Sequence, residues 1–137
     1  MRKKFGRYSE TEASNRIAEL LQRIRESIVF VEGKRDKEAL IALGCNAENI
    51  YTISGNLKQS CEQVMERNVK IVMILTDLDR RGNELAKRAG EELERYSITI
   101  DGTTRIEIAR TLNLRFFEDL ERKYLKFLEE IKQSGKI

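Results

Sequence analysis

Apolar residues recur along the chain in two patterns, one typical of amphipathic helices and one typical of buried strands. Helical spacing, with an apolar residue at every third or fourth position, runs over Glu10–Glu26 and again over Arg115–Lys132. Between them lie short runs that are apolar at nearly every position, as strands covered on both faces are: Ser27–Val31, Ile50–Ile53, Ile71–Leu75 and Tyr96–Ile100. The pattern predicts buried strands with an amphipathic helix on either side.

Segments of helical composition separate these apolar runs. Asp36–Leu43 and Glu84–Arg95 are two of them, and Thr104 with Glu107 has the spacing of a capping box that opens a further helix. Strands that alternate with helices form right-handed βαβ units and a parallel sheet. We therefore predict an α/β fold with a parallel sheet of about four strands and helices on both of its faces.

The composition restricts the possible chemistry of the protein more than it restricts the possible fold. The 137 residues include no His and only two Cys, Cys45 and Cys61, so zinc sites of the usual Cys/His kind are excluded, as are mechanisms that need imidazole. Catalysis would have to use carboxylates, Lys, Arg, hydroxyls or a hard metal ion with oxygen ligands. The two cysteines are interpreted as buried apolar residues. With no signal-peptide pattern and no apolar stretch of membrane-spanning length, we expect a reducing, cytoplasmic location and no membrane contact.

The positive charge of the chain is concentrated at its start. Lys and Arg number 26 against 23 Asp and Glu, a net charge of +3, and four of the basic residues fall within Met1–Tyr8, which has no acid. The remainder is close to neutral. This basic tail is compatible with contacts to nucleic-acid phosphates and equally with a passive, solvated terminus.

Carboxylates follow the predicted strands at the positions where sites form in open parallel sheets, beyond the carboxyl ends. Glu32 follows the first strand, and Asp77 and Asp79 follow the third. Asp77 and Asp79 are two residues apart in an extended segment, so their side chains point the same way. Converging carboxylates repel one another unless a cation lies between them, and an all-oxygen cluster suits Mg²⁺ or Mn²⁺. The alternative is that acids such as Asp79 or Asp36 only cap helices.

Two segments around these acids resemble the signatures of the Toprim domain. Val31–Asp36 is similar to the first signature, an acid-Gly pair that closes a strand with an Asp three residues beyond the Gly. Ile74–Gly82 is similar to the second, an Asp-x-Asp followed by basic residues and Gly. The resemblance implies a Rossmann-like Toprim fold over residues 27–112. A basic tail and N-terminal helix would precede it in residues 1–26, and a C-terminal helix packed on the same core would follow in 113–137.

The Toprim domain is shared by topoisomerases, bacterial-type primases, the overcoming-lysogenization-defect nucleases, recombination-mediator proteins and small ribosomal RNA maturation nucleases. The resemblance implies that Glu32 is the general acid or base, and that Asp77 and Asp79, together with Glu32, hold Mg²⁺ or Mn²⁺. Six further residues are candidates for substrate contact: Gly33, Lys34, Asp36, Arg80, Arg81 and Gly82. The cations among them, with Arg35, could instead pair with neighbouring acids, which contributes little to stability.

These features predict Mg²⁺-dependent phosphodiester chemistry on RNA or DNA, nuclease-like or primase-like. The alternative is a non-catalytic module that binds nucleic acid, or a protein partner through its terminal helices, within an RNA- or DNA-processing complex. Haloacid-dehalogenase phosphatases and response-regulator receivers fit the acidic residues less well, and no dinucleotide or P-loop fingerprint is present. The aromatic residues near the end of the chain have helical spacing and are interpreted as core, not as a platform for bases: Phe116, Phe117, Tyr124 and Phe127.

Overall fold

A four-stranded parallel sheet forms the centre of the computed structural model, which describes residues 9–133. Its strands, in the spatial order β2-β1-β3-β4, are β1 (Val29–Val31), β2 (Ile50–Thr52), β3 (Ile71–Leu75) and β4 (Thr99–Asp101). All neighbouring strands pair in parallel. The predicted α/β class and Rossmann-like parallel sheet are confirmed. The basic tail, Met1–Tyr8, lies outside the described residues.

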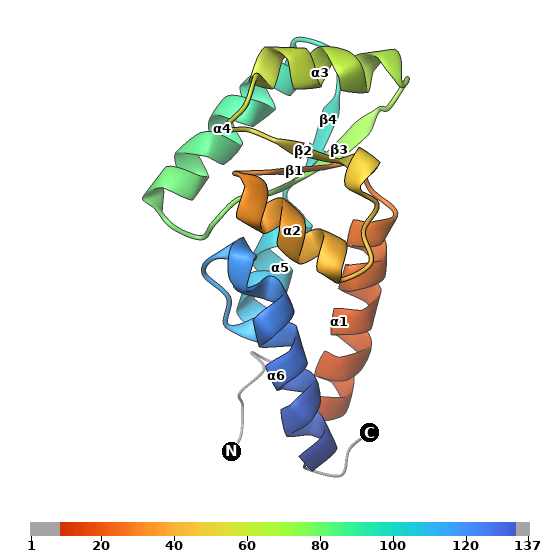
Figure 1. The fold of residues 1–137 in the computed structure, drawn as a ribbon, viewed down its shortest axis with the longest axis vertical. Helices are drawn as coiled ribbons and strands as arrows, with labels where there is room; N and C mark the ends of the chain where they lie inside the picture. The colour runs from red at the N-terminus through yellow and green to blue at the C-terminus, as the bar shows by residue number, and fades with distance from the viewer. Residues whose placement is uncertain (1–8, 134–137) are drawn as a thin grey trace.

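Helices cover both faces of the sheet (Figure 1). They are α1 (Glu10–Arg25), α2 (Lys34–Ala42), α3 (Leu57–Glu66), α4 (Arg80–Glu94), α5 (Thr103–Leu112) and α6 (Leu120–Gln133), with short 3₁₀ turns η1 (Ala47–Asn49) and η2 (Phe117–Asp119). One core joins the sheet to α3 and α4, and a larger one joins it to α1, α2, α5 and α6. No helix of the described part is both long and apolar enough to cross a membrane.

Both cores are built from the apolar positions that the sequence pattern marked. Ile17 and Leu20 of α1 are fully buried in the larger core, and Phe30 of β1 is fully buried in the smaller one. Cys45 and Cys61 are buried free thiols, as predicted. The capping box that opens α1 is present, with Ser9 and Glu12 as its two residues. The sequence pattern therefore located the core and its helices well.

Two predictions about the last two helices were wrong. Thr104 and Glu107 do not form a capping box, because α5 begins one residue earlier and Asp101 Oδ1 accepts the backbone N–H of Thr103 at 3.0 Å. Glu107 instead forms an ion pair with Arg16 of α1. The single helix predicted over residues 115–132 is also broken: residues 113–116 form a connecting segment, η2 follows, and α6 begins only at Leu120.

Candidate active site

The carboxyl ends of β1 and β3 bring Glu32 and Asp77 together. These strands are adjacent and in register, with Val31 opposite Leu75. Glu32 Oε2 accepts the backbone N–H of Asp77 at 2.8 Å, so the side chain that follows one strand is tied to the chain that follows the other. The carbonyl of Glu32 also accepts the N–H of Ser54, beyond β2, at 3.0 Å. Glu32 is thereby fixed between three strand ends.

Asp77 is half-buried and is affected by the charges of the other acids. Its Oδ1 accepts the backbone N–H of Phe117 at 2.9 Å. Burial raises the pKa of Asp77 to about 6, the Phe117 amide opposes that shift, and the negative charges of Glu32, Asp36 and Asp79 add to it. These like charges belong to residues that follow the adjacent strands β1 and β3.

Asp79 is the N-cap of α4, and its Oδ1 accepts the N–H of Gly82 at 2.7 Å. Asp79 therefore caps α4, as the capping alternative predicted, but it does so with only one of its two carboxylate oxygens. The helix is also held from the strand side, since Thr76 Oγ1 donates to the carbonyl of Gly82 at 2.7 Å. A Cβ atom at Gly82 would lie 1.9 Å from the carbonyl oxygen of Asp77. Glycine is thus required here for close approach of two backbone segments.

Asp36 lies deeper than the other acids and is only 7% exposed. Its Oδ2 accepts the N–H of Gly33 at 2.9 Å, which closes the turn from β1 into α2. Burial raises the pKa of Asp36, the amide of Gly33 lowers it, and the charges of Glu32 and Glu118 raise it further. In this position Asp36 holds the turn that carries Glu32.

A buried arginine that the sequence analysis missed lies beneath the acids. Arg105, in the first turn of α5, is 8% exposed. Its Nε donates to the carbonyl of Thr76 and its Nη2 to the carbonyl of Asp77 and to Asn83 Oδ1, each at 2.7 Å. Burial lowers the pKa of Arg105, whereas the charges of Glu32, Asp77 and Asp79 raise it.

A signal for this arginine was present in the sequence. Arg105 precedes Ile108, Ala109 and Leu112 by three, four and seven residues, so a charged residue stands on the apolar stripe of its helix. A charge in that position needs buried partners. Here the partners are the backbone carbonyls of the loop that carries the acids.

The donor set fits a hard divalent cation. Glu32, Asp77 and Asp79 each use one carboxylate oxygen to accept a backbone amide, and the other oxygen accepts no hydrogen bond from residues 9–133. Within that range no three Asp, Glu or Cys side chains are already drawn together as ligands of one ion. An ion held by one or two carboxylates and several retained waters is the arrangement that Mg²⁺ favours.

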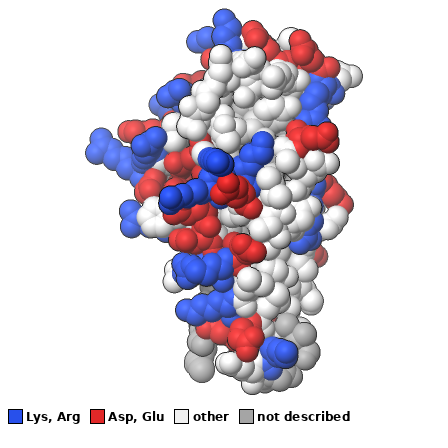
Figure 2. All heavy atoms as spheres, in the orientation of Figure 1, with Lys and Arg blue, Asp and Glu red and all other residues white. Residues whose placement is uncertain are grey.

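Basic side chains surround this edge of the sheet. Lys34 and Arg35 begin α2, Arg80 and Arg81 begin α4, and all four are exposed. Arg80 approaches Glu84 at 3.7 Å, with both side chains largely in water, and the other three form no ion pair within the described residues. Figure 2 shows Lys and Arg interspersed with Asp and Glu along one flank of the face in view.

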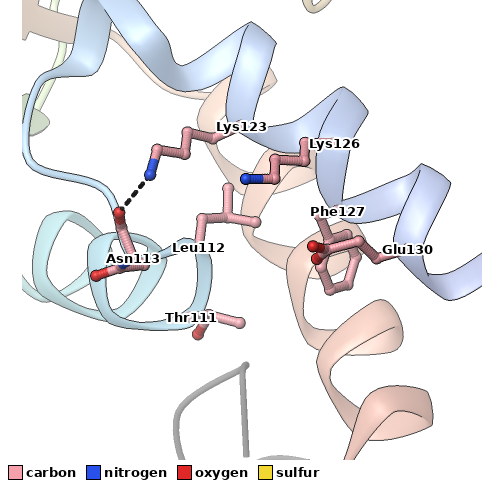
Figure 3. A pocket seen from close by; sticks show the side chains of 7 residues that line it. All are labelled: Thr111, Leu112, Asn113, Lys123, Lys126, Phe127 and Glu130. Atoms are coloured by element: carbon pink, nitrogen blue, oxygen red, sulfur yellow. Dashed lines mark hydrogen bonds between the residues drawn. The ribbon is translucent and has the colours of Figure 1, made fainter.

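A separate hollow of about 280 Å³ lies between α5 and α6 (Figure 3). Lys123 Nζ reaches across it to the carbonyl of Asn113 at 3.0 Å. The other lining residues are Thr111, Leu112, Lys126, Phe127 and Glu130. None of the residues predicted to form the site lines this hollow.

Comparison with known proteins agrees with the geometry. The family model of the Toprim domain matches residues 27–111. A UPF0292 protein of Thermococcus onnurineus (strain NA1) is 38% identical over 117 residues, covering 82% of this chain and 86% of that protein. A UPF0292 protein of Methanocaldococcus jannaschii is 37% identical over 92 residues, covering 67% of this chain and 72% of that protein.

A solved structure, described as a putative protein from Aquifex aeolicus, superposes with a TM-score of 0.65 at 28% identity, covering 77% of this chain and 95% of that one. The match covers most of the chain, in keeping with the predicted fold. The family match also includes both segments that carry the acids, Val31–Asp36 and Ile74–Gly82. The chain therefore belongs to the Toprim domain family and, by similarity along most of its length, to the UPF0292 proteins.

Proposed function

We propose that the chain catalyses metal-dependent phosphodiester chemistry on nucleic acid, nuclease-like or primase-like, at the edge of the sheet that carries Glu32, Asp77 and Asp79. One observation carries the proposal. Each of these carboxylates is fixed by a backbone amide through one oxygen, while its second oxygen accepts no hydrogen bond from residues 9–133. Membership of the Toprim domain family supports a metal-dependent role connected with nucleic acid.

In this proposal Asp77 and Asp79, with Glu32, hold Mg²⁺ or Mn²⁺. The bound ion supplies charge neutralisation at the phosphate and a position for water or a hydroxyl. The protein contributes anchoring: a backbone amide holds one oxygen of each carboxylate, and the other oxygen is left to turn toward an ion. Arg105 acts as a positioning residue, because it binds the carbonyls of Thr76 and Asp77 from below and does not reach the surface.

Glu32 is the residue that we assign to proton transfer. Its Oε2 is held by the Asp77 amide, which leaves Oε1 to accept a proton from, or donate one to, a reacting oxygen. Lys34, Arg80 and Arg81 are assigned to phosphates of the substrate strand, because they begin the two helices that follow the acidic strand ends and are exposed. Gly82 lets the first turn of α4 approach the backbone of Asp77 closely, and Gly33 donates its N–H to Asp36 in the turn after β1.

The test is an activity assay with end-labelled single- and double-stranded RNA and DNA, in Mg²⁺ or Mn²⁺, with and without nucleotides. We expect cleavage or extension of at least one substrate. Glu32→Gln preserves the acceptor for the Asp77 amide but removes the ionisable group, so the rate should fall by roughly 10²–10⁴-fold. Glu66→Gln, at the exposed end of α3 that leads into β3, is the matched control and should leave the rate unchanged.

Two results would count against the proposal. If the protein binds nucleic acid but converts none of the four substrates with either metal, the non-catalytic binding module becomes the better description. If Glu32→Gln retains activity within about twofold, Glu32 does not transfer the proton.

A further inference from the structure

The segment that joins α5 to η2, residues 113–116, lies directly on residues 77–79, the acidic loop between β3 and α4. The carbonyl of Arg115 accepts the N–H of Leu78 at 2.8 Å, and the N–H of Phe117 donates to Asp77 Oδ1 at 2.9 Å. The residue between these two contacts, Phe116, is therefore held next to the loop that carries Asp77 and Asp79.

The side chain of Phe116 faces away from the core. Its backbone is extended, with φ −114° and ψ 124°, so neighbouring side chains point in opposite directions. Phe117 is fully buried, whereas Phe116 is 38% exposed. The interpretation of Phe116 as a core residue was therefore wrong, because hydrogen bonds to the acidic loop interrupt the helix on which its spacing was judged.

A cation accompanies this exposed ring. Arg115 Cζ lies 5.1 Å from the centroid of the Phe116 ring, within the range of a cation–π contact. Arg115 is exposed and forms no ion pair with any residue from 9 to 133. The large apolar side chains exposed in that range are Ile41, Met65, Ile71, Phe116 and Leu125, and Phe116 is the aromatic one among them. An exposed aromatic with an unpaired arginine thus stands beside the carboxylates.

We propose that Phe116 stacks an unpaired base of a single-stranded nucleic acid beside the acidic site, and that Arg115 binds an adjoining phosphate. The proposal rests on the proposed function and narrows its substrate to strands with an unpaired nucleotide. Proteins that bind single strands combine aromatic rings, on which bases stack, with basic side chains that follow the backbone. Exposed Lys34, Arg35, Arg80 and Arg81 supply further positive charge at the same edge.

The absence of tryptophan from the chain allows a direct test. Phe116→Trp keeps an aromatic surface and introduces a single fluorophore at the proposed contact. Ile71→Trp places the same fluorophore at the amino end of β3, 60% exposed and at the opposite edge of the sheet. Both are made in the Glu32→Gln background so that the strand is not consumed, and are titrated in Mg²⁺ with oligo-dT and oligo-rU of about 12 nucleotides. We expect saturable quenching for Phe116→Trp and little change for Ile71→Trp.

Affinity is measured in parallel from the anisotropy of labelled strands. Phe116→Ala should raise the Kd for single strands by about 5-fold or more, and Phe116→Tyr should restore it, because stacking is lost in one and kept in the other. A blunt duplex should be insensitive to Phe116→Ala. Thermal melts of each variant confirm that it is folded.

The outcomes separate this inference from the proposed function. Tight single-strand binding without quenching, with a Kd for Phe116→Ala within about twofold of the parent, overturns the stacking role and leaves the proposed function standing. Equal dependence on Phe116 for duplex and single strand also overturns it, because paired bases offer no free face. If the parent binds no nucleic acid in either metal and no substrate is converted, both proposals fail.

Discussion

The acidic edge of the sheet and the hollow between α5 and α6 hold their polar groups in different ways. At the edge, Glu32, Asp77 and Asp79 each accept a backbone amide, and a buried arginine lies beneath them. In the hollow, Lys123 and Lys126 extend from one face of α6 on long side chains, and Lys123 is tied to one carbonyl (Figure 3). The edge is built from several strand ends, the hollow from two helices.

The difference indicates that the presence of a hollow is a poor guide to the position of the functional site in this molecule. A group can stabilise a developing charge or hold an ion only if its position is fixed before the ligand arrives. The acidic edge meets that condition, and the raised pKa of Asp77 is its electrostatic signature. The hollow meets this condition less well, because its lysines extend on long side chains and Lys123 is bonded to a single carbonyl. Substitutions should therefore have large effects at the edge and small ones in the hollow.

The largest effect on stability is expected from Arg105→Met. The methionine keeps apolar volume but leaves the carbonyls of Thr76 and Asp77 and the amide oxygen of Asn83 without their donor. It also removes the positive charge beneath the acids. The free energy of unfolding should fall by about 3–5 kcal/mol in urea denaturation. Arg110→Met, at an exposed site of the same helix, should change it by less than about 0.5 kcal/mol. Equal losses in both would show that Arg105 is not a buried anchor.

Gly82→Ala should be the next most damaging change. The new Cβ would lie 1.9 Å from a backbone oxygen, which cannot rotate away as a side chain can. We expect a loss of about 1–3 kcal/mol, with weakened Mg²⁺ binding because the Asp77–Asp79 loop must shift. Gly102→Ala is the control, since nothing lies within 4 Å of its Cβ. A melting temperature for Gly82→Ala equal to that of Gly102→Ala would contradict the close approach.

The raised pKa of Asp77 predicts a pH effect on stability. Between the unfolded pKa near 4 and the folded pKa of about 6, the folded protein binds more protons, so its stability rises as the pH falls. In EDTA, unfolding measured from pH 7 to 5 should show a gain on the order of 1 kcal/mol from this group, after allowance for solvent screening. Asp77→Asn should lack that gain, since it keeps the acceptor for Phe117 but cannot titrate. If the free energy of unfolding varied with pH in the same way for wild type and Asp77→Asn, the raised pKa of Asp77 would be contradicted.

The smallest effect is expected in the hollow. Lys126→Ala removes an exposed lysine that lines it. Nucleic-acid conversion and affinity should stay within about twofold of wild type, and the free energy of unfolding within about 0.5 kcal/mol. A tenfold loss of activity in this variant would move the functional surface from the sheet edge to α6.

The sequence could predict the sheet edge because its signals are local. Short apolar runs mark the strands, and parallel strands share one carboxyl edge, so Glu32, Asp77 and Asp79 were expected at that edge. The structure places Glu32 in contact with the backbone of Asp77 there. The break in the C-terminal helix could not be predicted from local patterns. It depends on Asp77 and Leu78 binding the backbone of Phe117 and Arg115, about forty residues later, and no local pattern records such a contact.

The start of the fourth strand was also predicted wrongly, by a few residues. The apolar run suggested a strand from Tyr96, but Ser97 has φ 60° and ends the turn after α4, so β4 begins at Thr99. Arg105 is the opposite case. Its place on an apolar helical stripe was visible in the sequence and indicated a buried charge, although not which carbonyls it binds.

The central claim is that Glu32, Asp77 and Asp79 form a site for a divalent cation. Thermal melts across a Mg²⁺ series at constant ionic strength test it most directly. Because the ion binds only the folded protein, wild type should gain about 2.7 kcal/mol at one hundred times the dissociation constant. The melting temperature should rise by several degrees, on the order of 10 °C at most. Asp77→Asn should lose most of this rise, and Glu66→Gln should keep it. If neither Mg²⁺ nor Mn²⁺ at millimolar concentration raises the melting temperature of wild type, the metal site is absent and the catalytic proposal fails with it.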